Sequence, residues 1–89
     1  MDTSMFEAKL KADGYTEIEV KTYQPHPPNG EHGHHFSVRG LVLEGAFTVI
    51  EDQKPVTYRT GESFAVAEGC LHAEEIGPVG ARVLIGRKY

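Results

Sequence analysis

The stretch His-Gly-His-His-Phe-Ser-Val-Arg-Gly-Leu-Val-Leu-Glu-Gly, residues 32–45, places three histidines directly ahead of an apolar, strand-forming run. On an extended strand, residues i and i+2 project to the same face. The imidazoles of His32 and His34 are therefore expected to converge with only Gly33 between them, whereas His35 points the other way. Neutral imidazole is a good ligand for divalent transition metals. The His-x-His pair thus indicates one part of a metal site.

A third imidazole is available from His72, which opens a strand-like run just after the turn at Gly69. Three neutral nitrogen ligands leave coordination positions open for water or a substrate. We therefore predict that His32, His34 and His72 bind a divalent transition metal ion, with Fe, Mn, Ni and Zn as candidates. Spacing alone leaves an alternative open, in which the histidines merely cluster on a solvated loop.

Most of the remaining chain consists of short strand-like runs separated by turn residues at intervals of about 8–12 residues. The runs are residues 17–23, 34–44, 46–50, 56–59, 63–67, 71–76 and 81–85. Glu51–Lys54 has the composition of a hairpin loop, and Gly77–Gly80 separates the last two runs. Crossover helices have no room in this chain, so we predict antiparallel sheets in an all-β barrel or sandwich.

One short helix is expected at the N-terminus, over Ser4–Asp13, with Thr3 or Ser4 as its cap and Gly14 as its stop. Its apolar positions near helical spacing are Met5, Ala8 and Ala12. The helix is followed by the alternating run 17–23, which is typical of a half-buried strand.

Length and composition narrow the class of protein. The 89 residues suffice for one modest core, so we expect residues 1–89 to form a single domain. The net charge is −4 and no basic run occurs, which predicts no nucleic-acid partner. No apolar stretch approaches the roughly 20 residues that span a bilayer, and the N-terminal residues do not resemble a secretory signal. A lone cysteine, Cys70, excludes an internal disulfide. Together these features predict a cytoplasmic protein without membrane contact.

The histidine stretch and a second run, Gly61–His72, resemble the two motifs of the cupin family. The first motif reads G-x5-H-x-H-x3,4-E-x6-G and ends here at Gly45, and the second reads G-x5-P-x-G-x2-H-x3-N. The resemblance covers Glu31–Ile76, about half of the chain. It implies an antiparallel jelly-roll barrel, or double-stranded β-helix, with a metal at its mouth. The ligand roles that it carries over fall on His32, His34 and His72.

The chain departs from these motifs at four positions. His26 stands in place of the leading glycine, Ala67 in place of the proline and Ile76 in place of the asparagine. Counting back from Gly45 also places Val38 where the first motif has its glutamate ligand. Because valine cannot coordinate a metal, the site either has three histidines only or recruits another carboxylate.

Glu74 is the candidate fourth ligand, because it lies two residues after His72 and would share its face on a regular strand. The alternative is that Glu74 and Glu75 form a solvated acidic pair. His26 is a second candidate, from a proline-rich loop where an exposed histidine is also expected. Cys70 could approach the metal as a soft ligand, or it could be a small buried thiol.

Other side chains also allow two interpretations. Arg39 could bind a substrate carboxylate. Its position on the face opposite His32 and His34 favours an outward-facing ion pair instead. Aromatic residues at alternating positions either line a pocket or fill the core; they are Phe36, Phe47, Tyr58 and Phe64. Gly40 would lie on the same face of the strand as the ligands, where its lack of a side chain would leave room in the barrel. Leu41 and Leu43 face outward and would suit the interface of a homodimer.

Two classes of function remain after this sequence analysis. The first is a metal-dependent enzyme, oxygenase- or isomerase-like, because three neutral ligands keep the metal Lewis-acidic and favour a small anionic, chelating substrate. The second is a non-catalytic module that binds a small molecule or a metal, and a further alternative is a cupin that has lost its metal. The sequence does not decide between them.

Overall fold

Strand β2 (Ser37–Glu51) is the long central strand of the computed structural model. One edge of β2 pairs antiparallel with β5 (Ala73–Lys88) along most of its length. The other edge pairs with β4 (Ser63–Val66) near the start of β2 and with β3 (Lys54–Arg59) near its end. Because β2 has different partners at its two ends, the sheet is able to fold over on itself.

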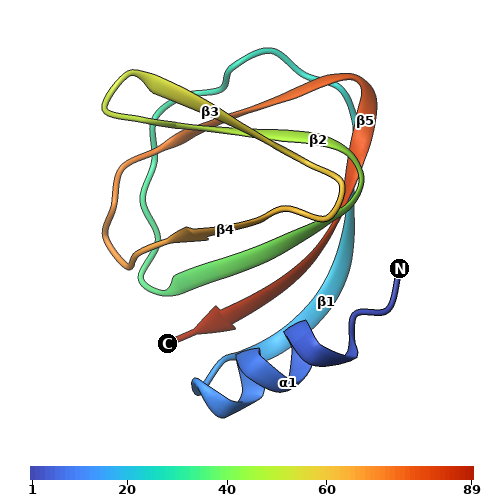
Figure 1. Cartoon of the computed structure of the whole chain (residues 1–89). Helices are drawn as coiled ribbons and strands as arrows, with labels where there is room; N and C mark the ends of the chain where they lie inside the picture. Colours follow the sequence, from blue (N-terminus) through green and yellow to red (C-terminus); the bar gives the residue numbers. More distant parts are fainter.

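The folded sheet forms two layers around a common interior (Figure 1). The structure describes residues 1–89. One layer contains β1 (Thr16–Tyr23), the end of β5, the start of β2 and β4. The other contains the start of β5, the end of β2 and β3, and isolated bridges from His26 and His32 extend it. The predicted antiparallel all-β barrel with one short helix is confirmed.

Two glycines allow β2 and β5 to pass from one layer to the other. Gly45 has φ +76°, and a Cβ atom added there would lie 2.1 Å from the carbonyl oxygen of Gly80. Gly80 has φ +72°, and its Cβ would lie 2.8 Å from the carbonyl oxygen of Tyr23. Register shifts in the β2–β5 ladder flank this crossing. Only glycine permits both this backbone conformation and this close approach.

The interior between the layers is filled by nine buried apolar side chains. They are Val42, Phe47, Val49, Phe64, Val66, Ile76, Ala81, Val83 and Ile85. The rings of Phe47 and Phe64 stack with centroids 4.9 Å apart. Gly40 faces this interior as predicted, but its space is taken by the Phe64 ring, since a Cβ would lie 2.5 Å from Phe64 Cζ.

Helix α1 (Ser4–Ala12) covers the outer face of the sheet, beside β1 (Figure 1). Its fully buried residue is Leu10, which packs against Gly86 of β5. Met5, Ala8 and Ala12, the apolar residues near helical spacing, are all exposed, Met5 at 87%. Leu41 does point outward, opposite Leu84, but both are buried on this face. Leu41 is therefore not available for the predicted dimer interface, and a homodimer stays a prediction.

An ion pair attaches the end of α1 to the sheet. The guanidinium of Arg39 donates to the Asp13 carboxylate and lies 4.6 Å from the centre of the Tyr15 ring. The outward ion pair predicted for Arg39 is thus confirmed. At the other end of the helix, Thr3 occupies the cap position, but its hydroxyl donates to the Glu7 carboxylate and caps no backbone group.

The strands are longer than their sequence patterns predicted. Two predicted runs merge into β2, which begins only at Ser37, and the last two runs merge into β5 across Gly77–Gly80. Pro78 lies in the part of β5 that has no register partner, so its missing N–H removes no ladder hydrogen bond. The hairpin is confirmed at Asp52 and Gln53, whose φ values of 54° and 63° fit a type I′ turn.

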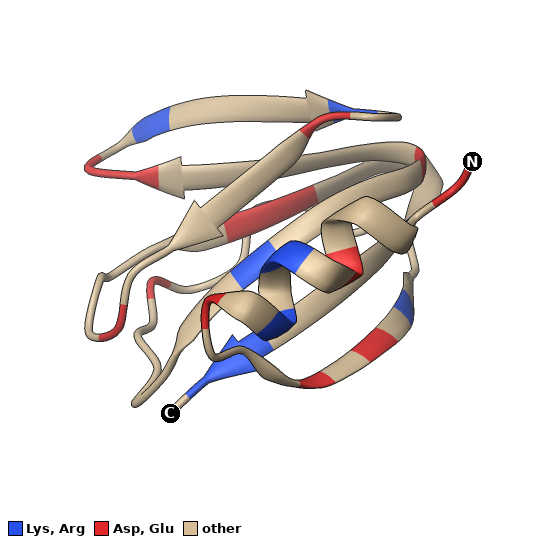
Figure 2. Ribbon diagram, turned by 60° about the horizontal axis from the view of Figure 1, so that its bottom comes forward, with Lys and Arg blue, Asp and Glu red and all other residues tan.

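Charged residues of both signs are mixed along the helix and the strands (Figure 2). Cross-strand ion pairs join Arg87 to Glu19 at 2.7 Å and Arg82 to Glu44 at 3.1 Å. Such partly exposed pairs add little stability. No helix in the structure is long and apolar enough to traverse a bilayer.

Replacing Gly45 with alanine is expected to destabilise the protein by about 2 kcal/mol or more, because alanine strains the left-handed backbone and its methyl group meets Gly80. Urea unfolding of Gly45→Ala measures this loss. Gly77→Ala is the matched control, since a Cβ at Gly77 meets nothing within 4 Å. Equal stability of the two variants would contradict the proposed crossing.

The Asp13–Arg39 pair predicts a pH-dependent stability. The guanidinium of Arg39 lowers the pKa of Asp13 from its ordinary value of 3.8. A group whose pKa is lowered on folding stabilises the protein above its unfolded pKa, and this stabilisation is lost as the pH falls through the folded pKa. Wild type should therefore exceed Asp13→Asn in unfolding free energy at pH 7, with the difference shrinking below about pH 4. A difference that does not change with pH would argue against the pair.

Candidate metal centre

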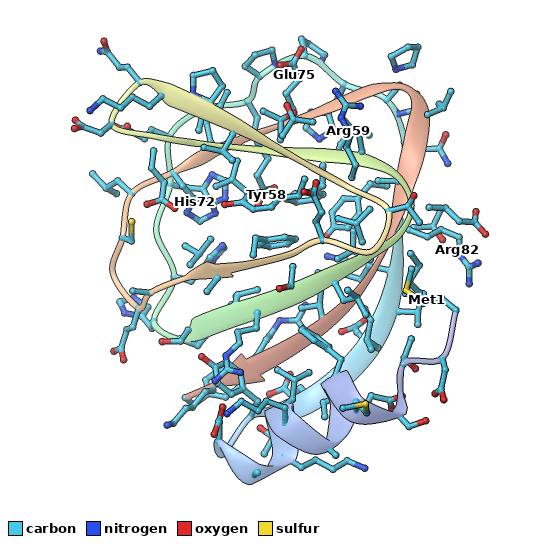
Figure 3. The ribbon with its side chains drawn as sticks, viewed as in Figure 1. Met1, Tyr58, Arg59, His72, Glu75 and Arg82 are labelled. Atoms are coloured by element: carbon cyan, nitrogen blue, oxygen red, sulfur yellow. The ribbon has the colours of Figure 1, made fainter.

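His32 and His72 face each other through a reciprocal pair of backbone hydrogen bonds. The N–H of each residue donates to the carbonyl of the other, and both distances are 2.9 Å. Residues paired in this way carry their side chains on the same face of the sheet. The two rings therefore lie side by side, with centroids 4.5 Å apart, and Figure 3 shows His72 inside the barrel.

His34 completes the cluster from the same loop as His32. Its ring centroid lies 5.1 Å from that of His32 and 5.3 Å from that of His72. The carbonyl of His34 accepts the N–H of Gly69 at 2.9 Å, and its ring stacks on Phe36 with centroids 4.8 Å apart. One potential ligand nitrogen from each of the three histidines lies within 4.8 Å of the others. The three side chains are close enough to hold one metal ion, as the motif predicted.

Backbone carbonyls orient two of the imidazoles. Nδ1 of His32 lies 2.9 Å from the carbonyl oxygen of Gly30, and Nδ1 of His72 lies 3.2 Å from that of Cys70. A carbonyl oxygen only accepts hydrogen bonds, so in each ring Nδ1 carries a proton, and the neutral form of the ring has its lone pair on Nε2. The same arrangement fixes ligand histidines in metalloproteins.

The cluster is sheltered from water on one side. His72 is 1% exposed, and His32 and His34 are half-buried. Partial burial and then the neighbouring His32 and His72 lower the pKa of His34. A lowered pKa favours the neutral imidazole, which is the form that binds metals.

Glu74 lies beside the three histidines. Its Oε2 atom is 3.4 Å from Nε2 of His72, and its side chain is 22% exposed. Glu74 therefore shares the face of His72, as its position two residues later suggested. It is not one of the three residues whose ligand atoms are all mutually close, so its role as a ligand stays a prediction.

The other candidate ligands lie outside the cluster. His26 points its Nδ1 atom at the carbonyl of Pro27, 2.7 Å away, and His35 is exposed. The Cys70 thiol donates to the Glu51 carboxylate at 3.3 Å. This hydrogen bond raises the pKa of the thiol, which keeps it protonated. Cys70 contributes only its backbone carbonyl to the site.

A cavity of about 150 Å³ opens in front of the three imidazoles. Its apolar lining includes Phe36, Phe47 and Phe64, whereas Tyr58 does not line it and packs against Phe64 instead. Val38, which the count along the first motif predicts at the position of the glutamate, also lines the cavity.

Sequence reasoning missed three polar residues that line this cavity: Lys21, Tyr23 and Arg87. The alternation in residues 17–23 suggested that the apolar residues face inward, but a bulge at Glu17, with φ 50°, precedes the regular part of β1. Val20 pairs with Leu84 on the outer face of the sheet and is 47% exposed, whereas Lys21 and Tyr23 face the cavity. Burial raises the pKa of Tyr23 to about 12. Arg87 follows Val83 and Ile85 in the strand alternation, and this pattern could have predicted that Arg87 faces the interior with them.

Among known proteins, similarity to this chain was found only among solved structures. No family model matches the sequence, and no curated protein matches it significantly. A cupin-2 domain protein of Shewanella frigidimarina aligns with 99% of this chain and 100% of its own, at a TM-score of 0.69 and 13% identity. The EutQ protein of Clostridium difficile aligns with 89% of this chain and 60% of its own, at a TM-score of 0.73 and 14% identity.

A further similar structure is a Cupin 2 conserved barrel domain protein of Salinispora arenicola, at a TM-score of 0.64 and 18% identity. That alignment covers 79% of this chain and 60% of the other protein. At such low identity, the likeness concerns the fold. The topology of the two layers, the histidine cluster at the barrel interior and these similar structures agree, and the chain therefore has the fold of a small cupin.

Proposed function

We propose that this protein binds one divalent transition metal ion through His32, His34 and His72, and that the site presents this ion to a small ligand in the cavity. The observation that supports the proposal is the convergence of three imidazoles, with ligand nitrogens within 4.8 Å of one another, at the wall of a cavity. Candidate ions are Fe, Mn, Ni and Zn, all of which accept imidazole ligands.

The donor set fits such an ion. Three imidazoles gathered in a half-buried site would repel one another if protonated, whereas their neutral forms offer three lone pairs to one cation. The carbonyls of Gly30 and Cys70 accept from Nδ1 of His32 and His72, so Nε2 is the nitrogen that each neutral ring would offer to the ion. His26 makes the same kind of contact with Pro27, so what sets the cluster apart is the mutual approach of its three rings.

The residues around the cluster define what the site could do. A bound divalent ion would act as a Lewis acid toward a coordinated oxygen. Glu74, next to His72, is the one carboxylate in the cavity lining and the candidate to accept a proton there. The apolar side chains of the lining limit the access of water to a ligand. The same features serve a metal-dependent enzyme and a non-catalytic ligand-binding module, and turnover of a small chelating acid would distinguish the enzyme.

The metal site makes a direct prediction. Reconstitution of the purified protein with zinc, followed by elemental analysis, should give about one equivalent per chain. His34→Ala removes one of three ligands from a half-buried position and should weaken zinc binding at least about 100-fold in a competition titration with a chromophoric chelator.

His35→Ala is the matched control, because His35 is adjacent in sequence but lies outside the cluster. Its zinc affinity should equal that of wild type, and circular dichroism checks that both variants fold. Less than about one-tenth equivalent of zinc, iron, manganese and nickel in the wild type would reject the metal site. Equal affinities of the two variants would reject the role of His34.

Glu74→Gln tests the proposed contribution of the carboxylate. It keeps the shape of the side chain and removes its charge, so we expect zinc binding to weaken about tenfold, in line with the loss of a carboxylate near a metal. Glu75→Gln is the control, because Glu75 is the adjacent acidic residue on β5 and does not line the cavity. If the two variants bind zinc equally well, the carboxylate of Glu74 has no part in the site.

A further inference from the structure

Two cationic side chains line the same cavity as the three histidines. Lys21 comes from β1 and Arg87 from the end of β5, which pair with each other in the sheet. Neither residue belongs to the histidine motifs, and neither is used by the metal site as proposed above. Their presence in a small, half-apolar cavity calls for a chemical explanation.

Lys21 has no acidic partner. No carboxylate lies within 4.0 Å of its Nζ atom, which instead sits 5.2 Å from the centre of the Tyr23 ring. An ammonium group over an aromatic ring keeps its charge and is free to pair with an anion. Lys21 is half-buried, so an anion placed beside it would be partly shielded from solvent.

Arg87 is only partly satisfied by the protein. Its Nη1 donates to Glu19 at 2.7 Å, and its side chain is 16% exposed. A guanidinium has five N–H donors, so one carboxylate contact leaves others available. Its carbon Cζ lies 5.9 Å from the centre of the Phe36 ring, and the same ring stacks on His34. Phe36 thus links the guanidinium to the histidine cluster.

The charge of the cavity favours an anion. Lys21 and Arg87 line it with one acidic residue, Glu74, and Glu19 already pairs with Arg87, so the excess of positive charge comes from the two charges that a divalent ion on three neutral imidazoles would add. The volume of about 150 Å³ is smaller than the roughly 300–1,000 Å³ of sites for drug-sized ligands, so the anion must be small.

We propose that Lys21 and Arg87 form the anion-binding side of the cavity, and that its ligand is a small carboxylic acid. One carboxylate of this acid pairs with the two cations, and a second oxygen atom faces the histidines. The second contact depends on the metal site proposed above. The cations recognise the carboxylate independently of the metal, so the two proposals can fail separately.

The test is calorimetric titration of zinc-loaded and metal-free protein with malonate, with its neutral diamide malonamide and with inorganic phosphate. Malonate should bind, malonamide should not, and phosphate should bind more weakly than malonate. Lys21→Met and Arg87→Met should each weaken malonate binding about tenfold or more, as expected for the loss of a charge-assisted contact. Zinc affinity should be unchanged in both variants.

Lys54→Met and Arg82→Met are the matched controls. Lys54 is exposed on β3, and Arg82 is ion-paired with Glu44 as Arg87 is with Glu19, but it projects away from the barrel (Figure 3). Both should bind malonate like wild type. Equal malonate affinities in all variants, no malonate binding by either form of the wild type, equal binding of malonamide, or tighter binding of phosphate would each overturn the inference.

The metal proposal is judged by a different readout. If zinc binds at one equivalent but malonate does not distinguish the variants, the metal site stands and the carboxylate site falls. If zinc does not bind, the metal site falls, and weaker binding of malonate to metal-free Lys21→Met and Arg87→Met than to the metal-free wild type still supports the carboxylate site.

Discussion

The reciprocal backbone hydrogen bonds between His32 and His72 hold the loop with two of the histidines against the third, which lies directly ahead of β5. These bonds place both imidazoles on one face regardless of what the side chains bind. The contacts of His34 with Gly69 and Phe36 then bring the third ring to the same point. The proposed metal site is therefore built by the backbone of the barrel, and the ion would bind to a largely preformed arrangement.

The barrel itself depends on a close approach of two backbones. Where β2 and β5 cross between layers, Gly45 and Gly80 approach too closely for side chains. This crossing places the start of β5, with Glu74 on it and His72 directly ahead of it, in one layer, and the end of β5, with Arg87, in the other. Histidines from one layer and cations from the other thus meet across a single cavity, which gives the site two chemically different sides.

The sequence predicted the parts of the site that local spacing encodes. The two cupin-like motifs were sufficient for the barrel and for the three histidines, although His32 and His34 lie outside regular strands. The cationic side of the cavity was not predictable in the same way, because the alternation of β1 does not show which of its two faces is inward, and its pairing with β5 turns Lys21 inward and Val20 outward. The buried face of α1 was also missed. The contact that buries Leu10 is with Gly86, which lies seventy-six positions further along the chain, so local spacing does not encode it.

X-ray absorption spectroscopy of the metal-loaded protein tests the central claim most directly, because it reports the ligands of the ion itself. For zinc, a single site with three imidazole nitrogens at about 2.0–2.1 Å is expected, together with the multiple-scattering pattern of imidazole rings. The His34→Ala protein should lose one imidazole from that shell. A shell of oxygen atoms without imidazole scattering would place the ion elsewhere on the protein and contradict the account.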